Sequence, residues 1–154
     1  MRFLNADEIA RGLSPFSPEK VAVKAGRLLL AEVESCLRAG ESFALESTLS
    51  GRTYVAMLRN ARAAGFMIEL NYLWLPSAEL AVRRVRQRIR KGGHAVPEPD
   101  IRRRYGRSLE HLLADYLPLA HVWSIWDNES SPPILLADST RYTVDAVETL
   151  LRHR

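Results

Sequence analysis

Short apolar runs alternate along the chain with longer segments that have a helical pattern. The apolar runs predict β-strands at residues 3–5, 42–46, 67–75, 122–126 and 134–136. Between them, apolar residues recur every three or four positions, which is the spacing of one buried helix face. The predicted helices cover residues 6–12, 18–39, 52–64, 78–91, 101–116 and 144–151. This alternation is typical of a three-layer α/β fold, in which helices flank a mainly parallel sheet.

Capping residues set the expected helix boundaries. Ser17, followed by Pro18, is expected to cap the second helix, and Gly40 to end it. The later helices are expected to start after Ser77, Asp100 and Thr143, and to stop at Gly65 and Gly92–Gly93. No repeat or linker divides the sequence. We therefore expect a single domain over residues 1–154, with a basic helical region at 77–117 within it.

Positive charge is concentrated in one part of the chain. The whole sequence has a net charge of +4, but residues 83–107 hold ten cations and two acids, so this stretch carries +8 and the remainder −4. An arginine guanidinium can donate two parallel hydrogen bonds to the oxygens of one phosphate. The stretch therefore favours a polyanionic partner: nucleic acid, a nucleoside triphosphate or an acidic protein. A solvated helix face is the alternative. The cations are Arg83, Arg84, Arg86, Arg88, Arg90, Lys91, Arg102, Arg103, Arg104 and Arg107.

The few cysteines and histidines limit which disulfides and metal sites the chain can form. The single Cys36 cannot form an internal disulfide, which favours a reducing cytoplasm. The four histidines have no metal-ligand spacing, so we expect no structural metal. Charged residues interrupt every apolar run before about 18 residues, and the N-terminus lacks the layout of a signal peptide. We expect neither secretion nor insertion into a membrane.

Two carboxylates stand out because ligands of layered α/β sheets bind beyond the carboxyl ends of the strands. Asp7 follows the first strand and lies in the first turn of its helix, where it could accept a proton from a hydroxyl or simply cap the helix. Glu46 ends an apolar strand. Burying a carboxylate without a partner is costly, so Glu46 either pairs with a cation such as Arg52 or faces a cleft and binds ligand hydroxyls.

The two basic helices are joined by Gly92–Gly93–His94, and two interpretations of this joint stay open. The helices could close over phosphates as a lid, with glycine amides cradling an anion, or the glycines could only stop a helix. A phosphate-binding P-loop requires GxxxxGK[ST]. None of Lys20, Lys24 and Lys91 follows a glycine or precedes Ser or Thr, so the sequence contains no such motif.

Taken together, the segments resemble the zeta-toxin-like family of small P-loop kinases. The similar pieces occur in family order over nearly the whole chain and are jointly specific. They are FLNADEIARGLSPFSPE, AGRLLL, GESFALESTLSGRTY, LWLPS, RVRQRIRKGGHAVPEPDIRRRYGRSL and WDNES. The resemblance implies transfer of a phosphoryl group from ATP, with Mg, to a small-molecule hydroxyl. In the zeta toxins the acceptor is a UDP-linked amino sugar, and the partner is an antitoxin protein.

The resemblance also implies roles for individual residues. Asp7 corresponds to the general base and Glu46 to the acid that holds the sugar, with Thr48 and Arg52 as neighbours. Arg84 and Arg88 correspond to lid arginines that neutralise the transferring phosphoryl group. Arg103 and Arg104 are further lid candidates for the nucleotide. Phosphoryl transfer depends on positioning and charge neutralisation, which these residue types supply.

One family element has no counterpart in the sequence. Family members begin with a strand and P-loop, and that strand lies centrally, between those expected here at 42–46 and 67–75. Without it we expect unpaired strand edges, pairing with a second copy through the gap, and no kinase activity. A misassigned start, a truncated remnant or a divergent binding protein would each explain this. The competing function is a non-catalytic nucleic-acid-binding protein that uses the face from Arg83 to Arg107, and a remnant without activity is a third.

Overall fold

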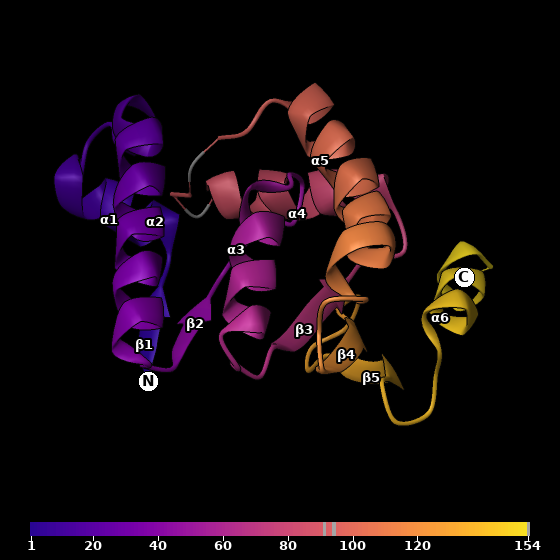
Figure 1. The fold of residues 1–154 in the computed structure, drawn as a ribbon. Helices are drawn as coiled ribbons and strands as arrows, with labels where there is room; N and C mark the ends of the chain where they lie inside the picture. Colours follow the sequence, from indigo (N-terminus) through magenta and orange to yellow (C-terminus); the bar gives the residue numbers. More distant parts are fainter. Residues whose placement is uncertain (91, 94, 154) are drawn as a thin grey trace. The chain divides into compact units, whose positions relative to one another are not determined.

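The computed structural model describes residues 1–90, 92–93 and 95–153. Lys91 and His94, which belong to the predicted basic stretch and lid joint, lie outside the described residues. The chain forms two compact units, Met1–Ser47 and Thr48–Arg154, which are described separately below. The prediction that they make up one domain stays a prediction. Figure 1 labels the helices and strands.

The first unit is a two-stranded parallel sheet with helices. β1 (Arg2–Leu4) pairs with β2 (Phe43–Leu45), with Leu4 opposite Leu45. The strands are joined by α1 (Ala6–Leu13), a 3₁₀ turn (Pro18–Val21) and α2 (Ala22–Ala39), which appear in indigo and violet in Figure 1. The apolar face predicted for the second helix is confirmed. Ala25, Leu29, Val33 and Cys36 are buried on it.

The start of this second helix was predicted wrongly. Residues 18–21 form a 3₁₀ turn, so the α-helix begins at Ala22, and the Ser17 side chain makes no capping hydrogen bond. The tighter turn arises where the Lys20 amide donates to the Ser17 carbonyl oxygen (3.2 Å). The predicted end is confirmed, because Gly40 caps α2 in the left-handed conformation (φ 67°), which glycine adopts without strain.

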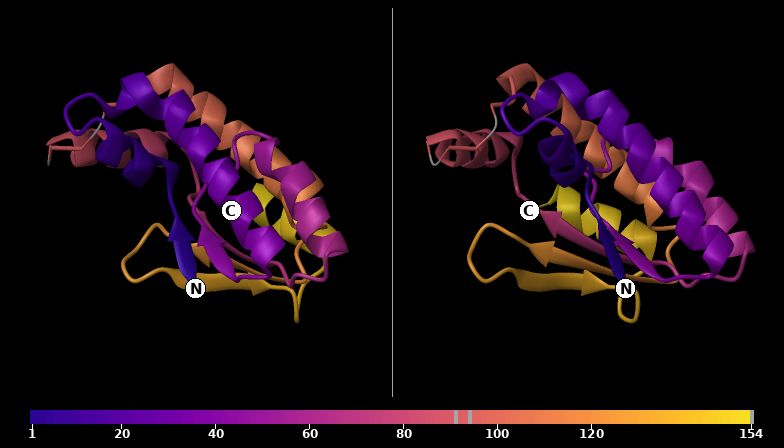
Figure 2. Two further views of the ribbon diagram at one scale, coloured as in Figure 1. Left: turned by 60° about the vertical axis from the view of Figure 1, so that its left-hand side comes forward. Right: turned by 90° about the vertical axis from the view of Figure 1, so that its left-hand side faces the viewer.

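The second unit is built on a three-stranded sheet. β3 (Glu69–Trp74) pairs in parallel with β4 (Val122–Asp127), and β5 (Ile134–Asp138) pairs antiparallel to β4. The helices are α3 (Thr53–Ala63), α4 (Ala78–Arg90), α5 (Glu98–His111) and α6 (Val144–Arg152), and a π-helical turn (Leu112–Tyr116) follows α5. Figure 2 shows α3, α5 and α6 on the same side of this sheet.

The core of the second unit lies between the sheet and those helices. Trp74, Trp123 and Ile125 point from β3 and β4 toward Leu112 and Tyr116, and all five are at most 5% exposed. Burying side chains of this size stabilises a fold by about 1.5–3 kcal/mol each. The terminal helix adds Val147 and Leu151 to the same cluster, and Thr143 caps it by accepting from the Ala146 amide, as predicted.

One further expectation is corrected here. α5 begins at Glu98 after Pro97, so Asp100 lies inside its first turn rather than capping it. The hydrogen-bonded strands form two sheets, β1–β2 and β3–β4–β5. In the sheets that the structure describes, β2 and β3 are both edge strands. Among the described residues, no helix is long and apolar enough to cross a lipid bilayer.

Candidate functional site

The first unit brings Asn5, Asp7 and Glu46 together beyond the carboxyl ends of its two strands. The parallel register places Leu4 beside Leu45, so the residues that follow them also become neighbours. The Glu46 amide donates to the Leu4 carbonyl oxygen (3.2 Å), which extends this pairing to the end of β2. Asn5 Nδ2 donates to Glu46 Oε2 (2.7 Å). The strand ends therefore position an amide and a carboxylate in direct contact.

Asp7 lies in the first turn of α1, as predicted. Its backbone N–H donates to Asn5 Oδ1 (2.8 Å), and its carboxylate is exposed. Within the described part of the chain, that carboxylate makes no hydrogen bond or ion pair. Asp7 is therefore available to accept a proton from a hydroxyl that reaches this helix start.

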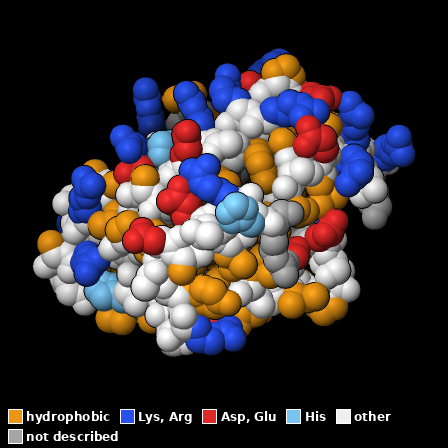
Figure 3. Space-filling view, turned by 90° about the vertical axis from the view of Figure 1, so that its right-hand side faces the viewer, with side chains coloured by type: hydrophobic (Ala, Val, Ile, Leu, Met, Phe, Trp, Pro, Cys, Tyr) orange, Lys and Arg blue, Asp and Glu red, His pale blue; other side chains and the backbone are white. Residues whose placement is uncertain are grey.

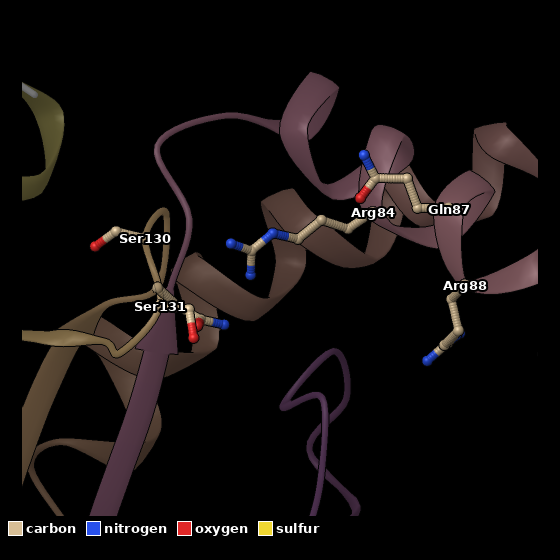
Figure 4. Close-up of a pocket in the computed structure, with 6 residues that line it drawn as sticks. Arg84, Gln87, Arg88, Ser130 and Ser131 are labelled. Atoms are coloured by element: carbon tan, nitrogen blue, oxygen red, sulfur yellow. The ribbon is translucent and has the colours of Figure 1, made fainter. Parts of the chain in front are cut away.

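Arg84 and Arg88 lie one helical turn apart on α4 and line the same hollow in the second unit. The hollow has a volume of about 460 Å³, within the range of small-molecule sites. Its other lining residues are polar: Gln87 on α4, and Asn128, Ser130 and Ser131 on the connection from β4 to β5. In Figure 4 the Arg84 side chain extends from α4 toward that connection. The sequence thus predicted the two arginines but not the wall opposite them.

The two arginines differ in how they are held. Arg84 is half-buried, and its Nη2 donates to the Glu129 carbonyl oxygen (2.9 Å), which fixes the guanidinium against the β4–β5 connection. Arg88 is exposed, and no described residue forms a hydrogen bond or ion pair with its side chain. One guanidinium is therefore placed by the protein, while the other keeps all its donors for a ligand.

Part of the basic stretch is neutralised by acids, which the sequence interpretation did not foresee. Glu98 accepts from Arg86 (2.7 Å) and from Arg102 (2.9 Å), and Arg102 also pairs with Glu79, so these contacts join α4 to α5. Hydrogen bonds from Arg102 hold the pKa of Glu98 below its ordinary value. Figure 3 shows red acidic side chains among the blue basic ones. These arginines stabilise the packing of the two helices and are less available to a polyanion.

Of the two remaining lid candidates, one is paired with an acid and the other is not. Arg103 pairs with Asp100 one turn earlier on α5 (2.9 Å), whereas Arg104 is exposed and has no hydrogen-bonded or ionic partner among the described residues. Arg107 resembles Arg104 in this respect. Neither Arg103 nor Arg104 lines the hollow.

The glycines after α4 act as a helix stop. The Gly92 amide donates to the Ile89 carbonyl oxygen and the Gly93 amide to that of Arg88, both at 2.9 Å. Gly92 adopts a left-handed conformation (φ 86°). Both amides are used by the helix itself, so the helix-stop interpretation holds and the anion cradle does not.

Arg52 and Thr48, the predicted neighbours of Glu46, belong to the second unit. Arg52 Nε donates to Asp115 Oδ2 (2.8 Å), and this hydrogen bond, with one from His111, holds the pKa of Asp115 below its ordinary value. The Thr48 hydroxyl is hydrogen-bonded to that of Ser50 (2.9 Å). The alternatives for Glu46 were a cation or ligand hydroxyls. The structure gives it a neutral amide partner, Asn5.

Two residues of these sites are marked by the sequence, although it assigns them no role. Asn128 follows a predicted strand, and Asn5 ends one, which is where α/β folds place ligand-binding side chains. The sequence gives no such signal for Ser130 and Ser131, because their position depends on the antiparallel pairing of β5 with β4.

Comparisons with known proteins support the fold. No family model matches the chain. An uncharacterized protein of Haemophilus influenzae is 29% identical over 102 residues, which are 66% of this chain and 73% of that protein. A solved chain from the PezAT chromosomal toxin–antitoxin system of Streptococcus pneumoniae superposes with a TM-score of 0.65 at 15% identity, over 99% of this chain and 67% of that one. At this identity the likeness concerns the fold alone. The mixed α/β class expected from the sequence is confirmed.

Proposed function

We propose that this chain supplies the lid and acceptor-binding residues of an ATP-dependent phosphotransferase that acts on a small-molecule hydroxyl. The observation that carries the proposal is that Arg84 and Arg88 line one hollow together with amide and hydroxyl side chains. Guanidinium, amide and hydroxyl groups are donors that suit phosphate oxygens. The sequence resemblance to zeta-toxin-like kinases and the likeness of the fold to a chain from a toxin–antitoxin system support the same assignment.

Arg84 and Arg88 would neutralise charge on the phosphoryl group during transfer. Such transfer requires little covalent chemistry from the protein, and arginines placed against the developing charge lower its barrier most. Arg84, held by Glu129, would act as the fixed donor, and Arg88 would complete the contact once a nucleotide is bound. Arg104 and Arg103 would contribute to the long-range field of the lid. ATP would bring Mg with it, since that ion is commonly held by phosphates and only one or two carboxylates.

Asp7 and Glu46 would serve the acceptor. We assign the exposed Asp7 carboxylate as the base that accepts the proton of the acceptor hydroxyl. Glu46 would accept hydrogen bonds from hydroxyls of a sugar nucleotide such as a UDP-amino sugar, with Thr48 and Arg52 as further polar contacts. An antitoxin protein is the partner we propose on the basis of the fold.

The phosphate-holding strand and P-loop are the part that this sequence does not supply. β2 and β3 each have one edge that pairs with no strand in the described part of the chain. We propose that a strand followed by a P-loop pairs with one of these edges in the active protein. Either a further segment or a second polypeptide could provide it, and a second copy of this chain is the competing occupant.

The competing function is binding of nucleic acid by the basic face. It is favoured by exposed arginines that form no hydrogen bond or ion pair with any residue the structure describes: Arg88, Arg90, Arg104 and Arg107. It is weakened by the ion pairs of Arg86, Arg102 and Arg103, which occupy the same stretch.

Two double variants with equal loss of charge separate these functions. Arg84→Gln/Arg88→Gln changes the hollow, and Arg104→Gln/Arg107→Gln removes two exposed arginines that lie outside it. Calorimetric titration with ATP, with tripolyphosphate and with a DNA duplex measures each interaction. We expect the first variant alone to lose ATP and tripolyphosphate binding, by about tenfold or more for the loss of two charged hydrogen-bond donors. Equal weakening of DNA binding in both variants, with no ATP binding by the unmodified chain, would instead favour the nucleic-acid function.

A further inference from the structure

We propose that Asn5 is a positioning residue whose single amide group fixes both the helix start that carries Asp7 and the orientation of the Glu46 carboxylate. The inference deepens the proposed function and rests on it for the roles of Asp7 and Glu46. The contacts themselves lie wholly within the first unit. From the sequence alone, Asn5 is only the last residue of a predicted strand.

The oxygen of the amide holds the start of α1. Asn5 Oδ1 accepts from the backbone N–H groups of Asp7 (2.8 Å) and Glu8 (3.2 Å), and the Asn5 backbone is extended, as at an N-cap. Two of the unpaired amides at the start of this helix are thereby satisfied. Because Asp7 is one of the two donors, the backbone from which its carboxylate extends is fixed by Asn5.

The nitrogen of the same amide holds Glu46. Asn5 Nδ2 donates to Glu46 Oε2 at 2.7 Å. The two sets of contacts determine which end of the amide faces which partner, because backbone N–H groups require an oxygen and a carboxylate requires a donor. Glu46 Oε1 receives no hydrogen bond from the described residues and stays available to a ligand.

This arrangement explains why asparagine suits the position better than other capping residues. Asp, Ser and Thr also cap helices through a side-chain oxygen, but none of them has an amide N–H for Glu46. An aspartate at position 5 would keep the cap and place a second negative charge against Glu46. The role of Asn5 as a link is therefore separable from its role as a cap.

A double-variant cycle isolates the link. In Asn5→Asp the cap is kept, but two carboxylates face each other. In Glu46→Gln the hydrogen bond is kept without charge. In Asn5→Asp/Glu46→Gln the bond is restored in the opposite direction, from the Gln amide to the Asp carboxylate. Asn5→Ser, which caps but cannot donate to Glu46 through an amide, serves if Asn5→Asp does not fold.

Cys36 offers a probe of this unit alone. It is fully buried in α2, so its labelling by a thiol reagent reports opening of the first unit. We expect Asn5→Asp to label about tenfold faster than the unmodified chain, and the double variant to return to within about twofold of Glu46→Gln, because the link is remade. Equal labelling rates in Asn5→Asp and the unmodified chain, or a double variant as fast as Asn5→Asp, would overturn the proposal.

Binding of a UDP-amino sugar, followed by ligand-observed NMR, separates this inference from the proposed function. If the link positions Glu46 for the acceptor, Asn5→Asp weakens binding of the sugar nucleotide. The double variant regains protection of Cys36 from labelling, but it does not regain sugar-nucleotide binding because it lacks the Glu46 carboxylate. If the labelling cycle shows the link while the unmodified chain binds no sugar nucleotide, Asn5 joins the two carboxylates as proposed and the acceptor class of the proposed function is wrong. Sugar-nucleotide binding that Asn5→Asp and Asn5→Ser leave unchanged contradicts the positioning role.

Discussion

Gly93 offers the sharpest test of how α4 ends and thereby of how Arg88 is placed. A Cβ added at this position would lie 2.6 Å from Arg88 Cγ and 2.8 Å from the Arg88 carbonyl oxygen. Because the second of these atoms belongs to the backbone, rotating a flexible side chain away cannot relieve the overlap. Gly93→Ala must therefore shift the last turn of α4 or break the hydrogen bond that the Gly93 amide donates to Arg88.

The size of the effect follows from the cost of forcing an extra carbon into an occupied space. Overpacking of this kind typically destabilises a protein by about 1–3 kcal/mol. With a urea dependence of about 2 kcal/mol per molar, a loss of about 2 kcal/mol lowers the unfolding midpoint by about 1 M. Gly106→Ala is the matched control. A Cβ at Gly106, inside α5, meets no atom within 4 Å, so alanine there should stabilise the helix by about 0.5–1 kcal/mol.

Urea unfolding followed by tryptophan fluorescence measures both variants in the relevant unit. Trp74, Trp123 and Trp126 all belong to the second unit, so the fluorescence signal reports that unit alone. We expect a lower midpoint for Gly93→Ala and a higher one for Gly106→Ala. Equal midpoints for the two variants would refute the close approach of residue 93 to Arg88 and, with it, the helix-stop interpretation of the glycine pair.

Two further predictions follow from contacts of one side chain, and a third from the strand edges. Tyr116→Phe removes the hydrogen bond that the Tyr116 hydroxyl donates to the Gly51 carbonyl oxygen (2.7 Å), and urea unfolding should show a loss of about 1 kcal/mol. Hydrogen bonds from Thr140 and then Arg141 lower the pKa of Asp138 from 3.8 to about 2. The stability it contributes is therefore complete above pH 4 and is lost as the pH falls toward 2; Asp138→Asn should flatten this part of the pH profile, and an unchanged profile would contradict the assignment. If β2 and β3 present open edges, light scattering of the isolated chain should show dimers, and a strict monomer over a wide concentration range would contradict pairing with a second copy.

The helices and strands were predictable because their signals are local. The apolar spacing of α2, the caps Ser77 and Thr143, and the stop at Gly40 all depend on residues within a few positions of each other. The start of α2 was missed because a Ser–Pro pair favours a 3₁₀ turn as readily as the first turn of an α-helix.

The site was predictable only in part, for a physical reason. Asp7, Arg84 and Arg88 carry their chemistry in their own side chains, so their residue types indicated them. The Arg86–Glu98 and Arg102–Glu79 pairs join residues 12 and 23 positions apart, and only the packing of α4 against α5 brings them together. The role of Asn5 could not be predicted either, for the same reason. Its role depends on the parallel pairing of β1 with β2, which joins residues 41 positions apart.

The most direct test of the phosphoryl-binding hollow is an NMR titration of the chain with ATP, observing the arginine Nε–H groups. The account predicts that the resonances of Arg84 and Arg88 shift and saturate together at one dissociation constant. The resonances of Arg104 and Arg107 should remain in place. Shifts spread evenly over all four arginines and abolished by moderate salt would contradict a built site in the hollow and indicate a general polyanion-binding face.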